Sequence, residues 1–293
     1  MKKRVLTRAA GDPESLVELI AVRLGVERRQ AKAWIDAGSV YLGGTRVGAA
    51  AAVAVGDRVT VFVVPPPAPG TDPIVIHRDE WIAVLDKPAG MPSQGEVSQR
   101  AVALDAFAWR HLGPGARMLH RLDKEASGLV LFALEARAQA PLQRALAAGE
   151  IDRRYVALVD GELRGDGAIR LRIARHATDR RLRAALPENA PAGESACSRF
   201  RSLARATWKG RPLTAVELTL ETGRTHQLRV HLSATGHPIV GDAAYRGPPF
   251  ERMCLHAHAL ELPHPRDGTR LRLSAPMPKS FAALVPGLTR PFT

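Results

Sequence analysis

A proline-rich segment divides this chain of 293 residues into a small and a large part. Residues 63–73, VVPPPAPGTDP, hold five prolines in eleven positions. Such a run forms an extended, semi-rigid connector and builds no packed core of its own. The length of the chain also suits about two domains. We therefore expect one unit at residues 1–63, a linker at residues 64–73 and a larger unit at residues 74–293.

The first unit is predicted to combine two helices with a hairpin and a further strand. Apolar residues recur at helical spacing from Leu16 to Leu24, and residues 27–37 form a second helix that ends at a glycine. Short strands on either side of Gly43-Gly44 are expected to pair as a hairpin, and residues 55–62 supply the last strand. A small α/β unit follows from this pattern.

Beyond the linker, short strands and a few helices follow one another without regular βαβ alternation. This order favours the α+β class, with a mixed, mainly antiparallel sheet, over a doubly wound parallel sheet. One strand, residues 213–220, alternates apolar and polar side chains and is expected to be half-buried. The other expected elements are strands at 81–85, 129–134 and 154–159, a hairpin with a surface loop within 164–195, and a helix at 225–235.

The charge balance points to a polyanionic partner. The chain has 42 Lys and Arg against 29 Asp and Glu, a net charge of +13, and only seven of the 42 are Lys. Guanidinium groups bind phosphate in a bidentate manner and stack on bases. An Arg-rich composition can also reflect the genome, but the surplus favours nucleic acid as the partner.

Cysteine usage and hydropathy suit a soluble, cytoplasmic protein, which we expect to be a monomer. Cys197 and Cys254 are far apart in the chain, which argues against a disulfide scaffold and a cysteine-based zinc site. His256 and His258 lie beside Cys254 on one strand, yet no fourth zinc ligand is evident. The basic start lacks an apolar segment of signal-peptide length, and the longest apolar tract is too short to span a membrane.

One carboxylate occupies a position that a fold does not require. Asp123 follows His120-Arg121-Leu122 and precedes an expected turn at Ser127-Gly128, which leads into an apolar strand. An Asp held there beside Arg121 is a candidate acid, base or nucleophile. A loop Asp that caps its own turn is the common alternative, and HRLD alone does not decide between the two.

The full run HRLDKEASGLVLFA resembles the signature of the RluA-like pseudouridine synthases. Three further blocks match that family in the same order: residues 84–93 (VLDKPAGMPS), 221–245 (ETGRTHQLRVHLSATGHPIVGDAAY) and 253–265 (MCLHAHALELPHP). Four ordered blocks are far more specific than one short motif. The resemblance implies the pseudouridine synthase fold and an RNA isomerase that needs neither cofactor nor metal.

The resemblance also assigns chemistry to three residues. This reaction detaches uracil from ribose, turns it and rejoins it through carbon 5, and the family places a nucleophilic Asp at the position of Asp123. Burial disfavours the charged form of a carboxyl group, and a guanidinium favours it. We expect Arg229 to be that partner, with Arg224 at the strand-to-helix turn as the alternate. Tyr155, in the matching block RRYVALVDG, is expected to stack on the extruded uracil.

Further residues are expected to bind RNA. His120 and Arg121 are candidates beside Asp123, and Lys87 either contributes to the pocket floor or has a purely structural role. Whether Asp123 attacks the ribose or the base, or abstracts a proton, is left open by the sequence.

The first unit has a resemblance of its own. RRQAKAWIDAGSVYLGGTRV resembles the RNA-binding domain first seen in ribosomal small-subunit protein S-four. Arg28, Arg29 and Lys32 match positions that contact the RNA backbone in that domain, and helical spacing puts them on one face. A solvated basic helix face is the alternative.

Together these features predict an RNA pseudouridine synthase, with large-subunit ribosomal RNA favoured over transfer RNA as the substrate. The competing hypotheses are a transfer-RNA synthase and a non-catalytic RNA-binding protein of ribosome assembly. A metal-dependent RNA hydrolase needs clustered carboxylates and histidines near a basic groove, and the sequence offers no such cluster.

Overall fold

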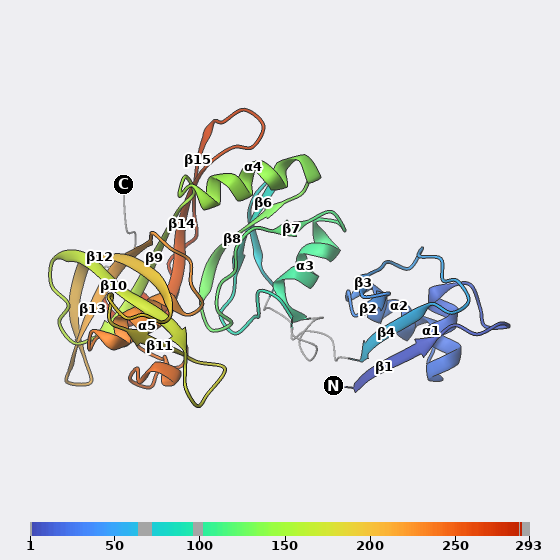
Figure 1. Ribbon diagram of the computed structural model, residues 1–293, viewed down its shortest axis with the longest axis horizontal. Helices are drawn as coiled ribbons and strands as arrows, with labels where there is room; N and C mark the ends of the chain where they lie inside the picture. Colours follow the sequence, from blue (N-terminus) through green and yellow to red (C-terminus); the bar gives the residue numbers. More distant parts are fainter. Residues whose placement is uncertain (1, 64–71, 96–101, 287, 289–293) are drawn as a thin grey trace.

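The computed structural model describes residues 2–63, 72–95, 102–286 and 288, and it contains two separate sheets (Figure 1). Helices accompany both sheets, so the predicted α+β class is confirmed. The predicted linker lies outside the described residues, except for residues 72 and 73. Within the described ranges, no helix has the length and apolar character needed to cross a bilayer.

The N-terminal unit is a four-stranded antiparallel sheet in the order β1-β4-β2-β3, covered by two helices. Leu16 and Ile20 of the first helix and Ile35 of the second are fully buried, and this core is separate from that of the larger unit. The predicted helices, hairpin and last strand are confirmed. Their bounds are β1 (Lys2–Thr7), α1 (Leu16–Leu24), α2 (Arg28–Asp36), β2 (Val40–Leu42), β3 (Thr45–Arg46) and β4 (Arg58–Val63).

The larger unit is built on an 11-stranded sheet, whose main path runs β11-β10-β12-β13-β9-β14-β8-β6-β5. Strand β15 pairs with β14 and β7 pairs with β8. The strands are β5 (Ile74–Arg78), β6 (Ile82–Lys87), β7 (Arg117–Met118), β8 (Ser127–Ala133), β9 (Asp152–Asp160), β10 (Asp166–Arg175), β11 (Arg183–Leu186), β12 (Glu194–Trp208), β13 (Arg211–Leu220), β14 (Leu255–Pro263) and β15 (Arg270–Ser274). The helices are α3 (Leu104–His111), α4 (Ala136–Ala147), α5 (Gln227–Ala234), η2 (Ala243–Tyr245) and α6 (Lys279–Leu284).

Strand β13 corrects one prediction. All residues from Leu213 to Leu218 are buried, including Glu217, although alternation predicts a half-buried strand. The strand lies between β9 and β12 in the middle of the sheet, where both of its faces are covered. Glu217 is accommodated there because Arg201 on the neighbouring strand donates to its carboxylate at 3.1 Å.

The sheet crosses between its two halves where β8 and β14 pair in parallel, with Gly128 opposite Ala257. Ser127-Gly128 therefore opens a strand, and the turn predicted there lies earlier, where the Ala126 amide donates to the Asp123 carbonyl oxygen at 3.2 Å. Gly128 has φ 115, and a Cβ atom there would lie 2.2 Å from the Ala257 carbonyl oxygen. Only glycine fits this crossing, which begins just after the Asp123 loop.

Helix α3 connects the two units. Arg46 of the N-terminal sheet donates from Nη1 to the Asp105 carbonyl oxygen at 3.0 Å, and Arg110 donates to the Ala37 carbonyl oxygen at 3.0 Å. The first turn of α3 is in turn bonded to the segment before it, since the Asp105 amide donates to the Ser93 carbonyl oxygen at 3.1 Å. The N-terminal unit thus contacts a helix that is tied to the Asp123 region through Ser93.

We expect Gly128→Ala to prevent stable folding, because its Cβ atom would overlap the Ala257 backbone. Gly210→Ala is the matched control, since Gly210 has φ 76 and a Cβ atom there would meet no heavy atom within 4 Å. Both changes carry the left-handed backbone cost of about 1–2 kcal/mol, and only Gly128→Ala adds the overlap. Thermal unfolding followed by circular dichroism compares them. Equal losses in Tm for the two variants would contradict this account of the crossing.

Candidate active site

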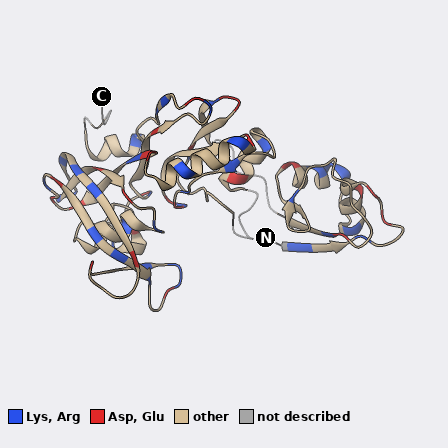
Figure 2. Ribbon diagram, turned by 45° about the horizontal axis from the view of Figure 1, so that its top comes forward, with Lys and Arg blue, Asp and Glu red and all other residues tan. Residues whose placement is uncertain are grey.

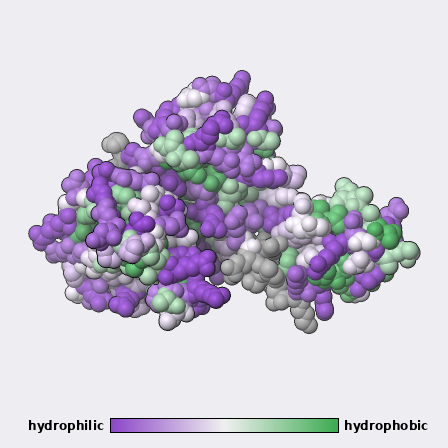
Figure 3. Space-filling view, in the orientation of Figure 1, coloured by the Kyte–Doolittle hydropathy of each residue, from purple (hydrophilic) through white to green (hydrophobic). Residues whose placement is uncertain are grey.

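Asp123 lies in the loop between β7 and β8 and lines a groove of about 1390 Å³. Segments far apart in the chain form its walls: the loop around Asp123, the start of β9 with Tyr155, and the turn into α5 with Arg229. Figure 3 shows one face of the molecule, on which hydrophilic residues predominate over the larger unit. The fold therefore gathers the three residues that the sequence predicts to be catalytic.

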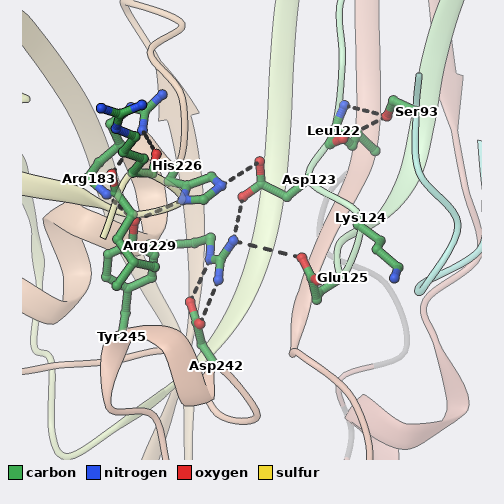
Figure 4. A network of polar contacts seen from close by, with 12 residues as sticks. Ser93, Leu122, Asp123, Lys124, Glu125, Arg183, His226, Arg229, Asp242 and Tyr245 are labelled. Atoms are coloured by element: carbon green, nitrogen blue, oxygen red, sulfur yellow. Dashed lines mark hydrogen bonds and ion pairs between the residues drawn. The ribbon is translucent and has the colours of Figure 1, made fainter. Parts of the chain in front are cut away.

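The centre of the site is a buried guanidinium shared by two carboxylates (Figure 4). Arg229 binds Asp242 through two bonds, from Nε to Oδ2 at 2.7 Å and from Nη2 to Oδ1 at 2.8 Å. Its Nη1 donates to Asp123 Oδ2 at 3.2 Å and lies 3.8 Å from Glu125. Burial alone lowers the pKa of Arg229, but the bonds and charges of Asp242 and Asp123 outweigh burial and raise that pKa.

Helix α5 holds Arg229 in place through the turn that precedes the helix. The Gln227 side chain accepts bonds from Thr222 Oγ1 at 2.8 Å and from the Arg224 amide at 3.0 Å. Its Nε2 donates to the Cys197 carbonyl oxygen at 2.9 Å, which anchors the turn to β12. Arg229 follows two residues later, in a helix whose residues 227–232 are all buried.

The structure separates the two arginines that the sequence leaves as alternatives. Arg224 lies 2.7 Å from Glu194 and donates to the Ser195 carbonyl oxygen at 3.3 Å. It lines the groove but pairs with the start of β12, whereas Arg229 contacts Asp123.

Two buried side chains fix the backbone of the Asp123 loop. Ser93 Oγ donates to the Leu122 carbonyl oxygen at 2.6 Å and accepts from the Leu122 amide at 3.0 Å. On the other side of Asp123, the Lys87 ammonium donates to the carbonyl oxygens of Lys124 at 3.2 Å and Ala126 at 2.5 Å. Lys87 is fully buried and is not among the residues that line the groove, which favours the structural role over RNA binding.

The remaining groove residues differ in exposure. Tyr155 is 4% exposed, and burial raises the pKa of its phenol. His120 Nε2 accepts from the Leu131 amide at 3.2 Å, and burial lowers the pKa of this ring to about 3, so it is neutral. Arg121 is exposed, and its Nη1 lies 3.4 Å from Gln94 Oε1 at the groove edge.

The three cations of the N-terminal unit lie on exposed positions of α2, away from the groove lining. Arg28 pairs with Glu18 at 2.7 Å, and Lys32 pairs with Asp36 at 2.6 Å. Exposed pairs of this kind contribute little to stability. Their side chains can therefore exchange these carboxylates for phosphate.

Three residues of the site are not predicted by the sequence: Asp242, Tyr245 and His226. The Tyr245 ring packs against the Arg229 guanidinium at 4.9 Å, and its hydroxyl contacts His226 Nδ1 at 2.8 Å. His226 Nε2 lies 4.0 Å from Asp123 Oδ1. All three lie in the block 221–245, but no local pattern marks them. In the described part of the chain, no three His, Cys, Asp or Glu side chains are grouped as a metal site.

Comparisons with known proteins identify the family of this chain. The RNA pseudouridylate synthase family matches residues 82–234. The ribosomal large subunit pseudouridine synthase D of Pseudomonas aeruginosa is 37% identical over 235 residues, covering 72% of this chain and 70% of the relative. The protein of the same name from Xanthomonas campestris is 34% identical over 287 residues, covering 89% of this chain and 84% of the relative.

A solved structure also resembles this fold. Human RNA pseudouridylate synthase domain containing 1 is 26% identical, with a TM-score of 0.64, over 78% of this chain and 94% of that one. The sequence family, the relatives and this structure point to one class of enzyme. The chain belongs to the RNA pseudouridylate synthase family, and the protein is an RNA pseudouridine synthase.

Proposed function

We propose that the protein converts uridines of large-subunit ribosomal RNA to pseudouridine, with Asp123 as the nucleophile. The observation that carries this assignment is the contact between Asp123 and the buried Arg229, at 3.2 Å, inside the groove of a pseudouridine synthase fold. The names of two relatives specify the large ribosomal subunit, which supports ribosomal over transfer RNA as the substrate.

The proposed chemistry uses residues of the chain itself. The bond from ribose C1′ to uracil N1 breaks, the uracil turns and a bond from C1′ to C5 forms. C5 loses a proton and N1 gains one, and the bond that Asp123 forms as the nucleophile is broken again before the product leaves. Nothing is oxidised or reduced overall. Arg229 holds Oδ2 of Asp123, and the Asp123 side chain keeps 23% of its surface exposed to the groove, where it can meet the extruded nucleotide.

Tyr155 is proposed to hold the detached base. An aromatic ring stacked on a base contributes about 1–3 kcal/mol and tolerates rotation of the base. Since burial raises the pKa of its phenol, the hydroxyl stays protonated, which favours stacking over a role as the base that removes the C5 proton.

RNA contacts are proposed along both units. Residues 1–63 form a domain like the S-four RNA-binding domain, and residues 64–73 join it to the catalytic domain at 74–293. The proposed RNA contacts of the first domain are made by Arg28, Arg29 and Lys32. The separate core of the first unit supports this division. Near the groove, Arg121 and Arg224 are proposed to bind phosphate, and His120 to shape the wall. Lys and Arg also recur along the long strands of the larger unit (Figure 2).

We also propose that the enzyme acts as a monomer in the cytoplasm. Asp123, Tyr155, Arg229 and Asp242 all come from one chain, so the site is complete without a second copy. The two cysteines are free thiols, in keeping with a reducing compartment.

The substrate and the nucleophile can be tested together in cells. Deleting the gene should remove pseudouridine from specific positions of large-subunit ribosomal RNA, and the wild-type gene should restore them. The Asp123→Asn gene should not restore pseudouridine, because the variant lacks the carboxylate charge. The variant should still fold, since Arg229 keeps its pair with Asp242. Pseudouridine mapping of total RNA gives the readout. Loss confined to transfer RNA would reject the ribosomal substrate, and restoration by Asp123→Asn would reject the nucleophile.

The RNA contacts of α2 can be tested by salt dependence. Each phosphate contact to double-stranded nucleic acid contributes about 0.9 to the slope of log K against log salt. Replacing Arg28, Arg29 and Lys32 with Ala should therefore reduce the slope by about 2–3 for the RNA fragment that mapping identifies. Arg270→Ala is the control, since Arg270 lies on β15, in the other unit and outside the groove lining. An unchanged slope in the triple variant contradicts the proposed contacts.

Ser93→Ala should slow the reaction without weakening RNA binding. The change removes both bonds to Leu122, so the backbone next to Asp123 loses its fixed position. We expect a fall in the single-turnover rate of about 10-fold or more, since small misplacements of reacting groups can reduce rates up to about 10²-fold. Ser93→Thr keeps the hydroxyl and should recover activity. Ser202→Ala, which removes a similar bond from β12 to the Leu163 carbonyl oxygen, is the control. Equal effects of Ser93→Ala and Ser202→Ala would exclude a specific role for Ser93.

A further inference from the structure

We infer that His226 is a further catalytic residue, whose Nε2–H donates a hydrogen bond to the uracil oxygen that gains charge as the C1′–N1 bond breaks. The inference rests on the proposed function and adds a second side chain, beyond Asp123 and its Arg229 partner, that acts on the reacting atoms. Three observations support it: the proton position on the ring, the direction of Nε2, and the backbone conformation of His226.

The hydrogen bonds around Tyr245 fix which nitrogen of His226 carries the proton. The Arg183 amide donates to Tyr245 Oη at 2.9 Å, and His226 Nδ1 lies 2.8 Å from the same oxygen. Of these two partners, the Arg183 amide can only donate, so Nδ1 is the one that can accept the hydroxyl proton. The hydroxyl therefore donates to Nδ1, and the ring proton resides on Nε2.

The protonated nitrogen faces the nucleophile across the groove (Figure 4). Nε2 lies 4.0 Å from Asp123 Oδ1, while Arg229 binds the other oxygen, Oδ2, at 3.2 Å. A separation of 4.0 Å exceeds hydrogen-bond length, so Asp123 does not saturate this N–H. A uracil placed against Asp123 would bring a carbonyl oxygen within reach of the donor.

The backbone at His226 is held in a conformation that side chains rarely adopt. His226 has φ 59 and ψ 18, in the left-handed region, directly before α5. Strained residues of this kind persist where the surrounding structure imposes them, and they cluster at active sites. Here the bonds of Gln227 to Thr222 and Cys197 hold the turn, and the conformation directs the ring toward Asp123.

The ring acts as a hydrogen-bond donor and not as an acid. Burial lowers the pKa of His226. The negative charge of Asp123 opposes this shift and the positive charge of Arg229 adds to it. Because the pKa is lowered, the ring is neutral near pH 7. When the C1′–N1 bond breaks, its electron pair passes to the uracil and is shared by N1 and the two carbonyl oxygens. The His226 N–H stabilises that charge without transferring its proton. The uracil then supplies an electron pair for the new bond from C5 to C1′, which replaces the bond that C1′ lost to N1. The C5 proton leaves afterwards and N1 takes up a proton.

The test compares His226→Gly with His226→Gln in single-turnover assays on the ribosomal RNA fragment found by mapping. Glycine removes the ring and adopts φ 59 without steric cost, and glutamine retains an N–H donor. Removing a donor of this kind reduces rates by about 10²–10³-fold, so we expect that loss for His226→Gly, with RNA affinity within about threefold of wild type. His226→Gln should regain part of the rate. His237→Gly, outside the groove lining, is the control.

The same RNA carrying 5-fluorouridine locates the affected step. Its base can detach and rejoin, but fluorine replaces the C5 proton that leaves last. If His226 acts on bond cleavage, His226→Gly slows rearrangement of 5-fluorouridine as strongly as that of uridine. If His226→Gly slows the reaction of uridine only, His226 acts in removal of the C5 proton and the inference is wrong. The inference is also wrong if the variant reacts at the wild-type rate, or if a lower RNA affinity accounts for its lower rate. Failure of the proposed function is distinct, because the wild-type protein would then form no product.

Discussion

The site depends on one interaction: the buried Arg229 guanidinium shared by Asp242 and Asp123. Asp242 is almost fully buried and takes two of the guanidinium bonds, so it fixes the orientation of Arg229 and balances its charge. Asp123 receives one longer bond. Removal of one partner from a buried ion pair is strongly destabilising, by about 3–5 kcal/mol, because the other charge stays buried. With Asp242 as the permanent partner, Asp123 can engage a substrate without leaving Arg229 unpaired.

The loop that carries Asp123 is fixed by parts of the chain distant in sequence. Ser93 bonds to the backbone before Asp123, and Lys87 bonds to the backbone after it. Lys87 is the last residue of β6, and Ser93 lies in the segment that follows this strand. Arg229 comes from α5, on the other half of the sheet. The β8–β14 pair, with Gly128 at its crossing, joins the two halves. The distance between the Asp123 carboxylate and the Arg229 guanidinium is therefore a property of the whole sheet and not of the Asp123 loop.

The sequence predicts the elements with strong local patterns and those site residues to which the family resemblance assigns a role. The helices of the first unit and Asp123, Tyr155 and Arg229 are of this kind. Strand β1 is not evident from the sequence because Lys3 and Arg4 interrupt the alternation of apolar and polar residues. Strand β13 is expected to be half-buried because its own sequence does not show that strands pair with it on both sides. Asp242 escapes prediction for a related reason, since it meets Arg229 only after η2 and α5 pack together.

The exposure of Asp123 indicates that water can reach its carboxylate in the free protein. Its side chain keeps 23% of its surface accessible, whereas Arg229 keeps 6%. The protein has thus buried the cation and left the carboxylate beside an open groove. Electrostatic interactions strengthen when water is excluded, so the contacts of Asp123 are expected to strengthen when a substrate covers the groove. Under the proposed function, RNA binding and reaction at Asp123 are coupled for this reason, because the bound RNA completes the wall that retains the detached uracil.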